Sequence, residues 1–381
     1  MGDIDRPDWS GRLRRVWRTP PVDVSALVVS SPANIKYLCG FDGSTGLVLT
    51  SPDRTWLLVD GRYDRSARLS RAAGQLADVE IATLTGPVER LLATLISGLG
   101  SGAIGFEAHH VTVATLRTWE RACGERSFVS TSNWIERLRI IKERAELSAI
   151  RRACTLTSDI ARGLGRWVRE GRTEREIAGD IEEAMRRAGS TRPAFETIVA
   201  SGPNSALPHA RPTDRQLQRG DLVVLDFGGV LDGYCGDLTR MAGVGEVKAE
   251  ARGLFDAVRA AQVAALAAVR AEALVFEVDA AARRVLTTHG FGDAILHATG
   301  HGLGLEVHEA PRLGRRSESI GGRPGEPSER EIDRLSAGMV CTIEPGAYVE
   351  GVGGVRLEDD VVVTDEGCEV LTEAPRDLLL V

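Results

Sequence analysis

The sequence predicts a mixed α/β protein with two domains, and three observations support this fold class. The chain has 381 residues, which is enough for two domains of the usual ~100–200 residues each. In the first third of the chain, short apolar segments alternate with helical ones and are bounded by Pro, Gly or Asp. The remainder repeats an order of two helices followed by strands, which suggests an internal duplication around a shared sheet.

We place the domain boundary where a polar stretch gives way to a strongly helical pattern. The two predicted domains therefore cover residues 1–133 and 134–381. A sheet shared between two duplicated halves would carry a cleft between them, and we expect the functional site in that cleft.

Composition excludes several classes of protein. With 43% hydrophobic and 27% charged residues, the chain is an ordinary globular protein and not a collagen-like or largely disordered one. The formal net charge of −7 argues against nucleic-acid binding. Neither a secretory signal nor an apolar run of the ~20 residues needed to span a bilayer is evident. The six cysteines are scattered without a Cys-x-x-Cys pair, so we expect reduced thiols, a cytoplasmic location and no membrane contact.

Turn signals and periodicity predict the elements in chain order. The first domain contains three predicted strands, at 26–30, 45–50 and 56–60. In the second domain, apolar residues at helical spacing predict a helix from Leu147 to Trp167. The next helix begins at Thr173, which can form a capping box with Glu176, and ends at Gly189. The further elements are strands 195–200 and 222–227, a returning strand through Arg240, helices 247–271 and 276–289, a strand near Ile295, and strands 340–349 and 354–364.

Four acidic residues lie inside or beside apolar strands, where a globular protein rarely places charge: Asp226, Asp237, Glu344 and Glu358. The turn at Asp232-Gly233 can form a hairpin that brings Asp226 and Asp237 opposite each other. Each acid alone has an ordinary explanation as a turn or surface residue, but their joint occurrence does not. Because buried unpaired carboxylates are costly, the four acids predict two divalent metal ions that balance their charge.

A histidine in a glycine-rich segment completes this set. His301 lies among Gly300, Gly302 and Gly304, which allow the backbone to approach a site closely. An oxygen-rich site with one imidazole and no thiolate favours Mn²⁺, with Co²⁺, Fe²⁺ or Zn²⁺ as alternatives. Two such ions lower the pKa of a water molecule and polarise a carbonyl group, which indicates hydrolytic chemistry.

These residues and the segments around them resemble the pita-bread metallopeptidases, the family of methionine aminopeptidases, Xaa-Pro aminopeptidases and Xaa-Pro dipeptidases (prolidases). The matching segments of the second domain are Ile198-Val-Ala-Ser-Gly-Pro-Asn204, Pro208-His-Ala210, Gly233 to Arg240, His297 to Pro311, Ile343-Glu-Pro-Gly346 and Gly353 to Asp359. In the first domain, Asn34 to Phe41 and Asp60-Gly-Arg-Tyr63 resemble the creatinase-like N-terminal domain of the prolyl branch. The resemblance therefore implies a creatinase-like N-terminal mixed α/β domain followed by a pita-bread catalytic domain.

The resemblance also implies the ligand set of a dinuclear site. Asp226 would chelate one metal ion, and His301 and Glu344 would hold the other. Asp237 and Glu358 would bridge both ions. Glu344 would in addition act as the proton shuttle to the leaving imino nitrogen.

Four further residues take implied roles around the substrate. His209, His297 and His308 resemble the non-ligand histidines of the family, which bind substrate and stabilise the tetrahedral intermediate. Arg356 could pair with a substrate carboxylate or with an acid of the metal site, and the sequence leaves both roles open.

The implied activity is hydrolysis of Xaa-Pro bonds in short proline-containing peptides by a homodimer. Whether the enzyme is a dipeptidase or an aminopeptidase stays open, because both share these motifs. The alternatives are a creatinase-type C–N hydrolase or another non-peptidase of the same fold, and a catalytically silent binding scaffold. Creatinases lack the full ligand set and scaffolds typically lose ligands, whereas all five ligand residues are present here.

One connection departs from the family pattern. Residues 312–336 are longer and more polar than is usual, and they include five arginines between positions 312 and 330. We expect a mobile loop over the cleft that limits the length of the substrate, a hypothesis that deletion of residues 316–328 would test.

Overall fold

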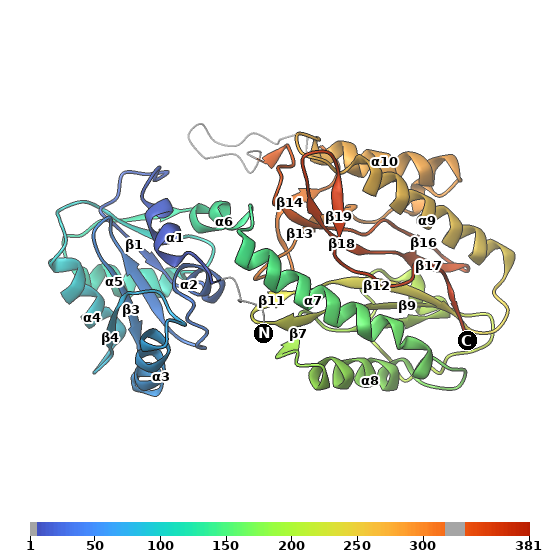
Figure 1. Ribbon diagram of the computed structural model, residues 1–381, viewed down its shortest axis with the longest axis horizontal. Helices are drawn as coiled ribbons and strands as arrows, with labels where there is room; N and C mark the ends of the chain where they lie inside the picture. Colours follow the sequence, from blue (N-terminus) through green and yellow to red (C-terminus); the bar gives the residue numbers. More distant parts are fainter. Residues whose placement is uncertain (1–5, 317–331) are drawn as a thin grey trace. The chain divides into compact units, whose positions relative to one another are not determined.

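The computed structural model describes residues 6–316 and 332–381 (Figure 1). Most of the loop that we predicted over residues 312–336 therefore lies outside the described residues. The chain divides into two compact units, with the division between Arg139 and Ile140. Among the described residues, no helix is both long enough and apolar enough to cross a membrane.

The N-terminal unit is a mixed sheet with helices around it. The six strands lie in the order β4-β3-β2-β1-β5-β6, and three of them correspond to the predicted strands. Their bounds are β1 (Ala26–Val29), β2 (Leu47–Thr50), β3 (Thr55–Val59), β4 (Glu80–Thr83), β5 (Ile104–Glu107) and β6 (Phe128–Thr131). The helices are α1 (Trp9–Val16), α2 (Pro32–Cys39), α3 (Gly61–Ala72), α4 (Val88–Ser97), α5 (Val113–Cys123) and α6 (Trp134–Arg139). Alternate strand residues such as Val28 and Leu58 pack against α4 and α5, which gives this unit its own core.

The C-terminal unit contains the two predicted pairs of helices. These are α7 (Arg144–Arg162), α8 (Glu174–Arg187), α9 (Ala249–Ala268) and α10 (Val275–Thr288). The capping box of α8 is confirmed, since Thr173 Oγ1 accepts from the backbone N–H of Glu176 and the Glu176 carboxylate accepts from that of Thr173. Beyond the helix, Gly189 has a φ of +105°, a backbone conformation that favours glycine.

The strands of this unit form separate hydrogen-bonded sheets, so the prediction of one shared sheet is wrong. One sheet has the order β20-β12-β9-β8, with β8 (Ile198–Ser201), β9 (Leu222–Phe227), β12 (Leu238–Gly243) and β20 (Leu379–Leu380). The other has the order β14-β13-β15-β18-β19, with β13 (Gly300–Gly302), β14 (Glu309–Leu313), β15 (Val340–Ile343), β18 (Asp359–Val363) and β19 (Cys368–Val370). Two small sheets complete the unit: β16 (Gly346–Val349) with β17 (Gly353–Arg356), and β7 (Arg192–Pro193) with β10 (Gly229–Leu231) and β11 (Tyr234–Cys235).

The strand predicted near Ile295 is also wrong. Residues Gly292–Ala294 form a short 3-10 helix, η3, and the next strand begins only at Gly300. The turn at Gly290, with its φ of +84°, leads into this tight helix and not directly into a strand.

Two hydrophobic cores lie on opposite faces of β9, and Figure 1 shows the corresponding layers of helices within this unit. Val223, Leu225 and Phe227 pack with α7 and α8. The alternate residues Leu222 and Val224 pack with α9 and α10. Since side chains alternate along a strand, the next position of the second series is Asp226, which therefore points between the two sheets.

Candidate metal centre

Asp226 is a buried acid whose two carboxylate oxygens have different surroundings. Its Oδ2 atom forms an ion pair with the guanidinium of Arg356. Its Oδ1 atom is buried and has no hydrogen-bond partner among the described residues. A buried carboxylate oxygen without a donor is costly, so this atom is suited to a ligand that the protein does not itself provide.

The other three acids lie beside strands, one of the two kinds of position predicted for them, where the continuous predicted strands are interrupted. Asp237 lies between β11 and β12, Glu344 between β15 and β16, and Glu358 between β17 and β18. Pro345 follows Glu344 and cannot donate to a strand ladder, which explains the break at that position. At another break, the N–H of Glu358 donates to the carbonyl oxygen of Thr239 at 3.3 Å, which links the two sheets.

The glycines around His301 are required by the close packing of three strands. A Cβ atom at Gly300 would lie 2.0 Å from the carbonyl oxygen of Thr342, and one at Gly302 would lie 2.2 Å from that of Ala310. Both distances are far below van der Waals contact. The glycines therefore allow β13 to lie between β14 and β15, and His301 projects from this strand.

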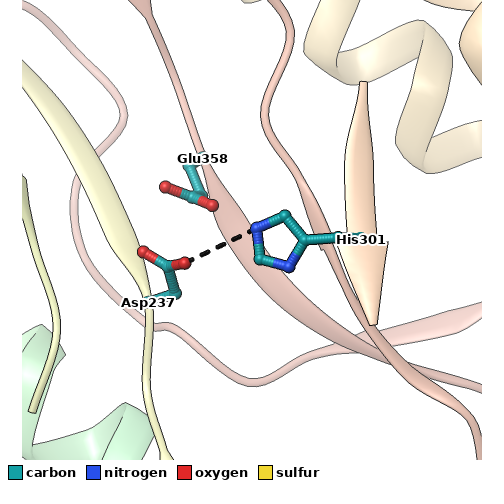
Figure 2. A group of neighbouring side chains, drawn as sticks. All are labelled: Asp237, His301 and Glu358. Atoms are coloured by element: carbon teal, nitrogen blue, oxygen red, sulfur yellow. Dashed lines mark ion pairs between the residues drawn. The ribbon is translucent and has the colours of Figure 1, made fainter. Parts of the chain in front are cut away.

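Three of the predicted ligands meet at one point. Asp237, His301 and Glu358 each offer a ligand atom, and these atoms all lie within 4.8 Å of one another. Figure 2 shows the three side chains pointing toward one another, with His301 Nε2 at 3.8 Å from Asp237 Oδ2. A further acid lies close to this group, since Glu344 Oε1 is 3.3 Å from His301 Nε2.

Burial and mutual repulsion raise the pKa values of Asp237, Glu344 and Glu358 in the absence of a cation. Burial raises the pKa of Asp237 well above its ordinary value, and the charges of Glu358 and Asp226 raise it further. The pKa of Glu358 is likewise raised well above its ordinary value by burial and then by Glu344. Burial, opposed by Arg356, raises the pKa of Glu344 to about 7. The protein thus concentrates carboxylates that need either protons or metal ions.

The imidazole of His301 offers a nitrogen lone pair to these acids. Burial lowers the pKa of His301 to about 4, so the ring is neutral at neutral pH. Its Nδ1 lies 3.0 Å from the carbonyl oxygen of Gly302, an acceptor, which places the single ring proton on Nδ1. The lone pair of Nε2 then faces the carboxylates of Glu344 and Asp237. Acceptors that face one another in this way fit a bound metal cation.

A chain of hydrogen bonds extends from Asp226 to His297. Arg356, which is paired with Asp226, donates from Nη1 to the hydroxyl of Tyr348 at 2.6 Å. His297 Nδ1 donates to the carbonyl oxygen of Ala298 at 2.8 Å, so its Nε2 accepts from the Tyr348 hydroxyl at 2.8 Å. Burial and the charge of Arg356 lower the pKa of His297 to about 4, consistent with a neutral ring. Of the two pairings left open for Arg356, the structure shows the one with a metal-site acid.

The other two predicted site histidines, His209 and His308, have exposed side chains near the four predicted acid ligands, which we call the acid cluster: Asp226, Asp237, Glu344 and Glu358. The ring of His308 packs edge-on against that of His301, with 4.3 Å between the ring centroids. Burial and the neighbouring His209 and Arg312 lower the pKa of His308. The side chain of His209 is exposed, in the segment that follows the short helix η2 (Gly202–Ala206).

Sequence reasoning missed three residues that support the cluster. Asp360 accepts from the N–H of Asp237 at 2.9 Å, and the hydroxyl of Thr239 donates to Glu358 at 2.7 Å. Tyr348 joins Arg356 to His297 as described above. The acidic run from Glu358 to Asp360 was a signal for the first, whereas nothing local in the sequence marks the other two.

Comparison with protein families agrees with this geometry. Residues 148–365 match the model of metallopeptidase family M24, and residues 22–141 match the creatinase/prolidase N-terminal domain. The chain belongs to metallopeptidase family M24. As a member of family M24 it is a hydrolase, and it has the expected creatinase-like N-terminal domain and M24 catalytic domain.

Similar proteins within family M24 span both units. An Xaa-Pro dipeptidase from Pyrococcus furiosus is 31% identical over 358 residues, which are 93% of this chain and 95% of that protein. The solved structure of an Xaa-Pro dipeptidase from Bacillus anthracis has a TM-score of 0.88 and 33% identity, with 98% of this chain and 99% of that chain covered. An X-Pro aminopeptidase structure from Thermotoga maritima has a TM-score of 0.84 and 32% identity, with 94% and 98% covered.

Proposed function

We propose that the protein is a dinuclear metal-dependent peptidase that hydrolyses Xaa-Pro bonds in dipeptides or at the N-terminus of short peptides. The observation that carries this proposal is the group of buried Asp237, partly buried His301 and buried Glu358, in which a neutral imidazole presents its lone pair to carboxylates. Relatives named Xaa-Pro dipeptidase and X-Pro aminopeptidase align with both units of the chain, which supports the prolyl specificity.

The proposed ligand set follows from the positions of the acids. Asp226 would hold one ion through its free oxygen, His301 and Glu344 would hold the other, and Asp237 and Glu358 would contact both. When bound, two divalent cations supply the Lewis-acid chemistry of amide hydrolysis. Mn²⁺ is the proposed metal because the donors are carboxylate oxygens with a single imidazole.

Glu344 is the proposed proton carrier. Its Oε1 lies 3.3 Å from His301 Nε2, which places the carboxyl group at the proposed metal centre. A carboxyl group of this kind can accept a proton and then deliver it to the imino nitrogen of the leaving proline. Such a transfer matters for an Xaa-Pro bond, whose nitrogen carries no hydrogen of its own.

The histidines and Arg356 take the proposed positions around the substrate. His209 and His308 have exposed side chains that can donate hydrogen bonds to a substrate carbonyl group. His297 accepts from Tyr348 and would act beside them. Arg356 is buried and paired with Asp226, and its binding of a substrate carboxylate stays a prediction.

We further propose a cytoplasmic homodimer. The six cysteines are all unpaired, which supports a reducing compartment. The dimer is proposed from the resemblance alone, and sedimentation at micromolar concentration would test it.

Two peptide substrates distinguish a dipeptidase from an aminopeptidase. Initial rates on Ala-Pro and Ala-Pro-Ala should be measured with added Mn²⁺. A dipeptidase should prefer Ala-Pro, and an aminopeptidase should prefer Ala-Pro-Ala. Cleavage of neither peptide would contradict the proposal and favour a creatinase-type hydrolase or a binding scaffold.

The metal content of the Asp237→Asn variant tests the proposed site. Because Asp237 would contact both ions, we expect roughly two bound ions to fall to one or none and activity to be lost. Elemental analysis after reconstitution measures the content directly. The exposed Asp293 provides a matched control, since Asp293→Asn should retain both ions. Unchanged metal content in Asp237→Asn would contradict the ligand assignment.

A further inference from the structure

The segment from Ser201 to Thr213 carries His209 in an exposed position and has little regular structure. Only the short helix η2 and the last residue of β8 are regular within it. Exposed segments of this kind are usually variable in position. A histidine that must meet a substrate carbonyl group needs a defined position, so the contacts that fix this segment decide how His209 can act.

A buried carboxylate holds both ends of this segment. Glu174, the first residue of α8, is 0% exposed. At one end, its Oε1 accepts from the N–H and the hydroxyl of Ser201, each at 2.7 Å, and from the side-chain amide of Asn204 at 3.0 Å. At the other end, its Oε2 accepts from the N–H of Thr213 at 3.0 Å and from its hydroxyl at 2.6 Å. The Asn204 amide also reaches Oε2 at 3.1 Å.

This arrangement requires a carboxylate. In the described part of the chain no ion pair reaches Glu174, so its charge is stabilised by these hydrogen bonds and by its place at the N-terminus of a helix. Every donor points at an acceptor oxygen. A glutamine would present an N–H₂ group to one end of the segment and leave its buried donors without an acceptor.

The middle of the segment is attached to the acid cluster. The hydroxyl of Ser205 accepts from the N–H of Gly354 in β17 at 2.9 Å. The carbonyl oxygen of Pro208, the residue before His209, accepts from Arg356 Nη1 at 3.2 Å. The ends held by Glu174 and the middle held by β17 together define where His209 stands relative to the acid cluster.

We propose that Glu174 is a positioning residue for His209, which it places against the substrate by fixing both ends of the segment 201–213. This inference rests on the proposed function, because it takes His209 as a substrate contact. Glu174 touches neither substrate nor metal ligand in this account and acts only through His209.

A double-mutant cycle on the metal-loaded enzyme tests the inference. The variants are Glu174→Gln, His209→Ala and the double variant, with kcat and KM measured on the preferred Xaa-Pro peptide. Misplacement of His209 by about 1 Å should lower kcat/KM about 10- to 100-fold in Glu174→Gln. If Glu174 acts through His209, adding Glu174→Gln to His209→Ala should cost little more. An equal loss in both backgrounds would show an independent structural role and overturn the proposal.

Two further variants guard against a simple folding defect. Glu176→Gln on the same helix keeps the capping box and should leave kcat/KM unchanged. Thr213→Val preserves shape but removes one donor to Glu174, and it should show a smaller loss with the same dependence on His209. If Glu174→Gln does not fold, the cycle with Thr213→Val decides the question, and an additive loss there would overturn the proposal.

Hydrogen exchange separates failure of this inference from failure of the proposed function. In Glu174→Gln, or in Thr213→Val if the former does not fold, the backbone amide at position 213 should exchange at least about tenfold faster, while those of β9 stay protected. This result does not depend on peptidase activity. Inactive wild-type protein with this pattern would contradict the proposed function and leave the structural tether intact, whereas unchanged exchange would overturn the tether itself.

Discussion

His301 and His297 have the same tautomer, but the partners of their Nε2 atoms differ. Both rings are partly buried and neutral, and both donate their one proton from Nδ1 to a carbonyl oxygen, of Gly302 and of Ala298. Their Nε2 atoms meet different partners. That of His301 faces carboxylates and is suited to a metal ion, whereas that of His297 accepts from the hydroxyl of Tyr348.

Removal of the Tyr348 hydroxyl should change the titration of His297. The hydroxyl stabilises the neutral ring by donating to Nε2, so Tyr348→Phe should raise the pKa of His297 above its value of about 4. It should also lower the free energy of unfolding by about 1–3 kcal/mol, because an Arg356 N–H loses its partner. NMR titration of the histidine signals measures the pKa. Tyr63→Phe in the N-terminal unit is the control, and an unchanged His297 titration in Tyr348→Phe would contradict the tautomer assignment.

Two helices, α8 and α10, hold the irregular segments that carry His209 and His297. Glu174 on α8 holds the segment of His209 as described above. On α10, Asp279 accepts from the N–H of Thr299 at 3.1 Å and from its hydroxyl at 2.8 Å, and Arg283 donates to the carbonyl oxygen of His297 at 2.8 Å. In both cases a buried acid on a regular element fixes an irregular segment, which keeps functional side chains in place.

The close approach of β13 to its neighbours gives a prediction for Gly300. Gly300→Ala places a Cβ atom against the backbone of Thr342, which cannot move away as a flexible side chain could. We expect the free energy of unfolding to fall by more than about 2 kcal/mol and metal binding to weaken. Chemical denaturation and elemental analysis measure the two effects.

Gly253 offers the matched control for this substitution. It lies on the exposed face of α9, and a Cβ atom there would meet nothing within 4 Å. Gly253→Ala should leave metal binding unchanged and stabilise the helix by about 0.5–1 kcal/mol. Equal stability of the two alanine variants would refute the close-packing argument.

For the whole molecule, the buried acids link stability to pH. In the metal-free protein, the pKa of Glu344 is raised from 4.5 to about 7 and that of Asp360 from 3.8 to about 8. The folded state therefore keeps protons that the unfolded state has lost, and this contribution to stability disappears as the pH rises through these values. His297 and His301 act in the opposite direction, but only between about pH 4 and their ordinary pKa of 6.5.

Above pH 6.5 the carboxylates alone decide the direction. For protein kept metal-free with EDTA, we expect the free energy of unfolding to fall by at least about 1 kcal/mol between pH 6.5 and pH 8. Saturating Mn²⁺ should remove this decrease, because cations replace the protons, and should raise the melting temperature. Denaturant unfolding at both pH values, with EDTA and with Mn²⁺, measures this. A flat profile in EDTA would contradict the raised pKa values.

The local features of this protein could be predicted from the order of its amino acids. Thr173 and Glu176 define the start of α8 through contacts within one turn, and the apolar run before Asp226 defines β9. The chemical types of the site residues were also readable, because acids beside apolar strands and a histidine among glycines are unusual. These features depend on near neighbours in the chain, which the sequence shows directly.

The way in which distant segments meet could be seen only in the folded structure. The fold places Asp237, Glu344 and Glu358 in breaks between strands and pairs Arg356 with Asp226. It also surrounds Glu174 with donors from the two ends of the segment 201–213. None of these contacts has a local signal, since each joins residues more than twenty positions apart or depends on where a strand ladder stops. Burial then fixed the protonation of His301, because the cost of a charge depends on everything packed around it.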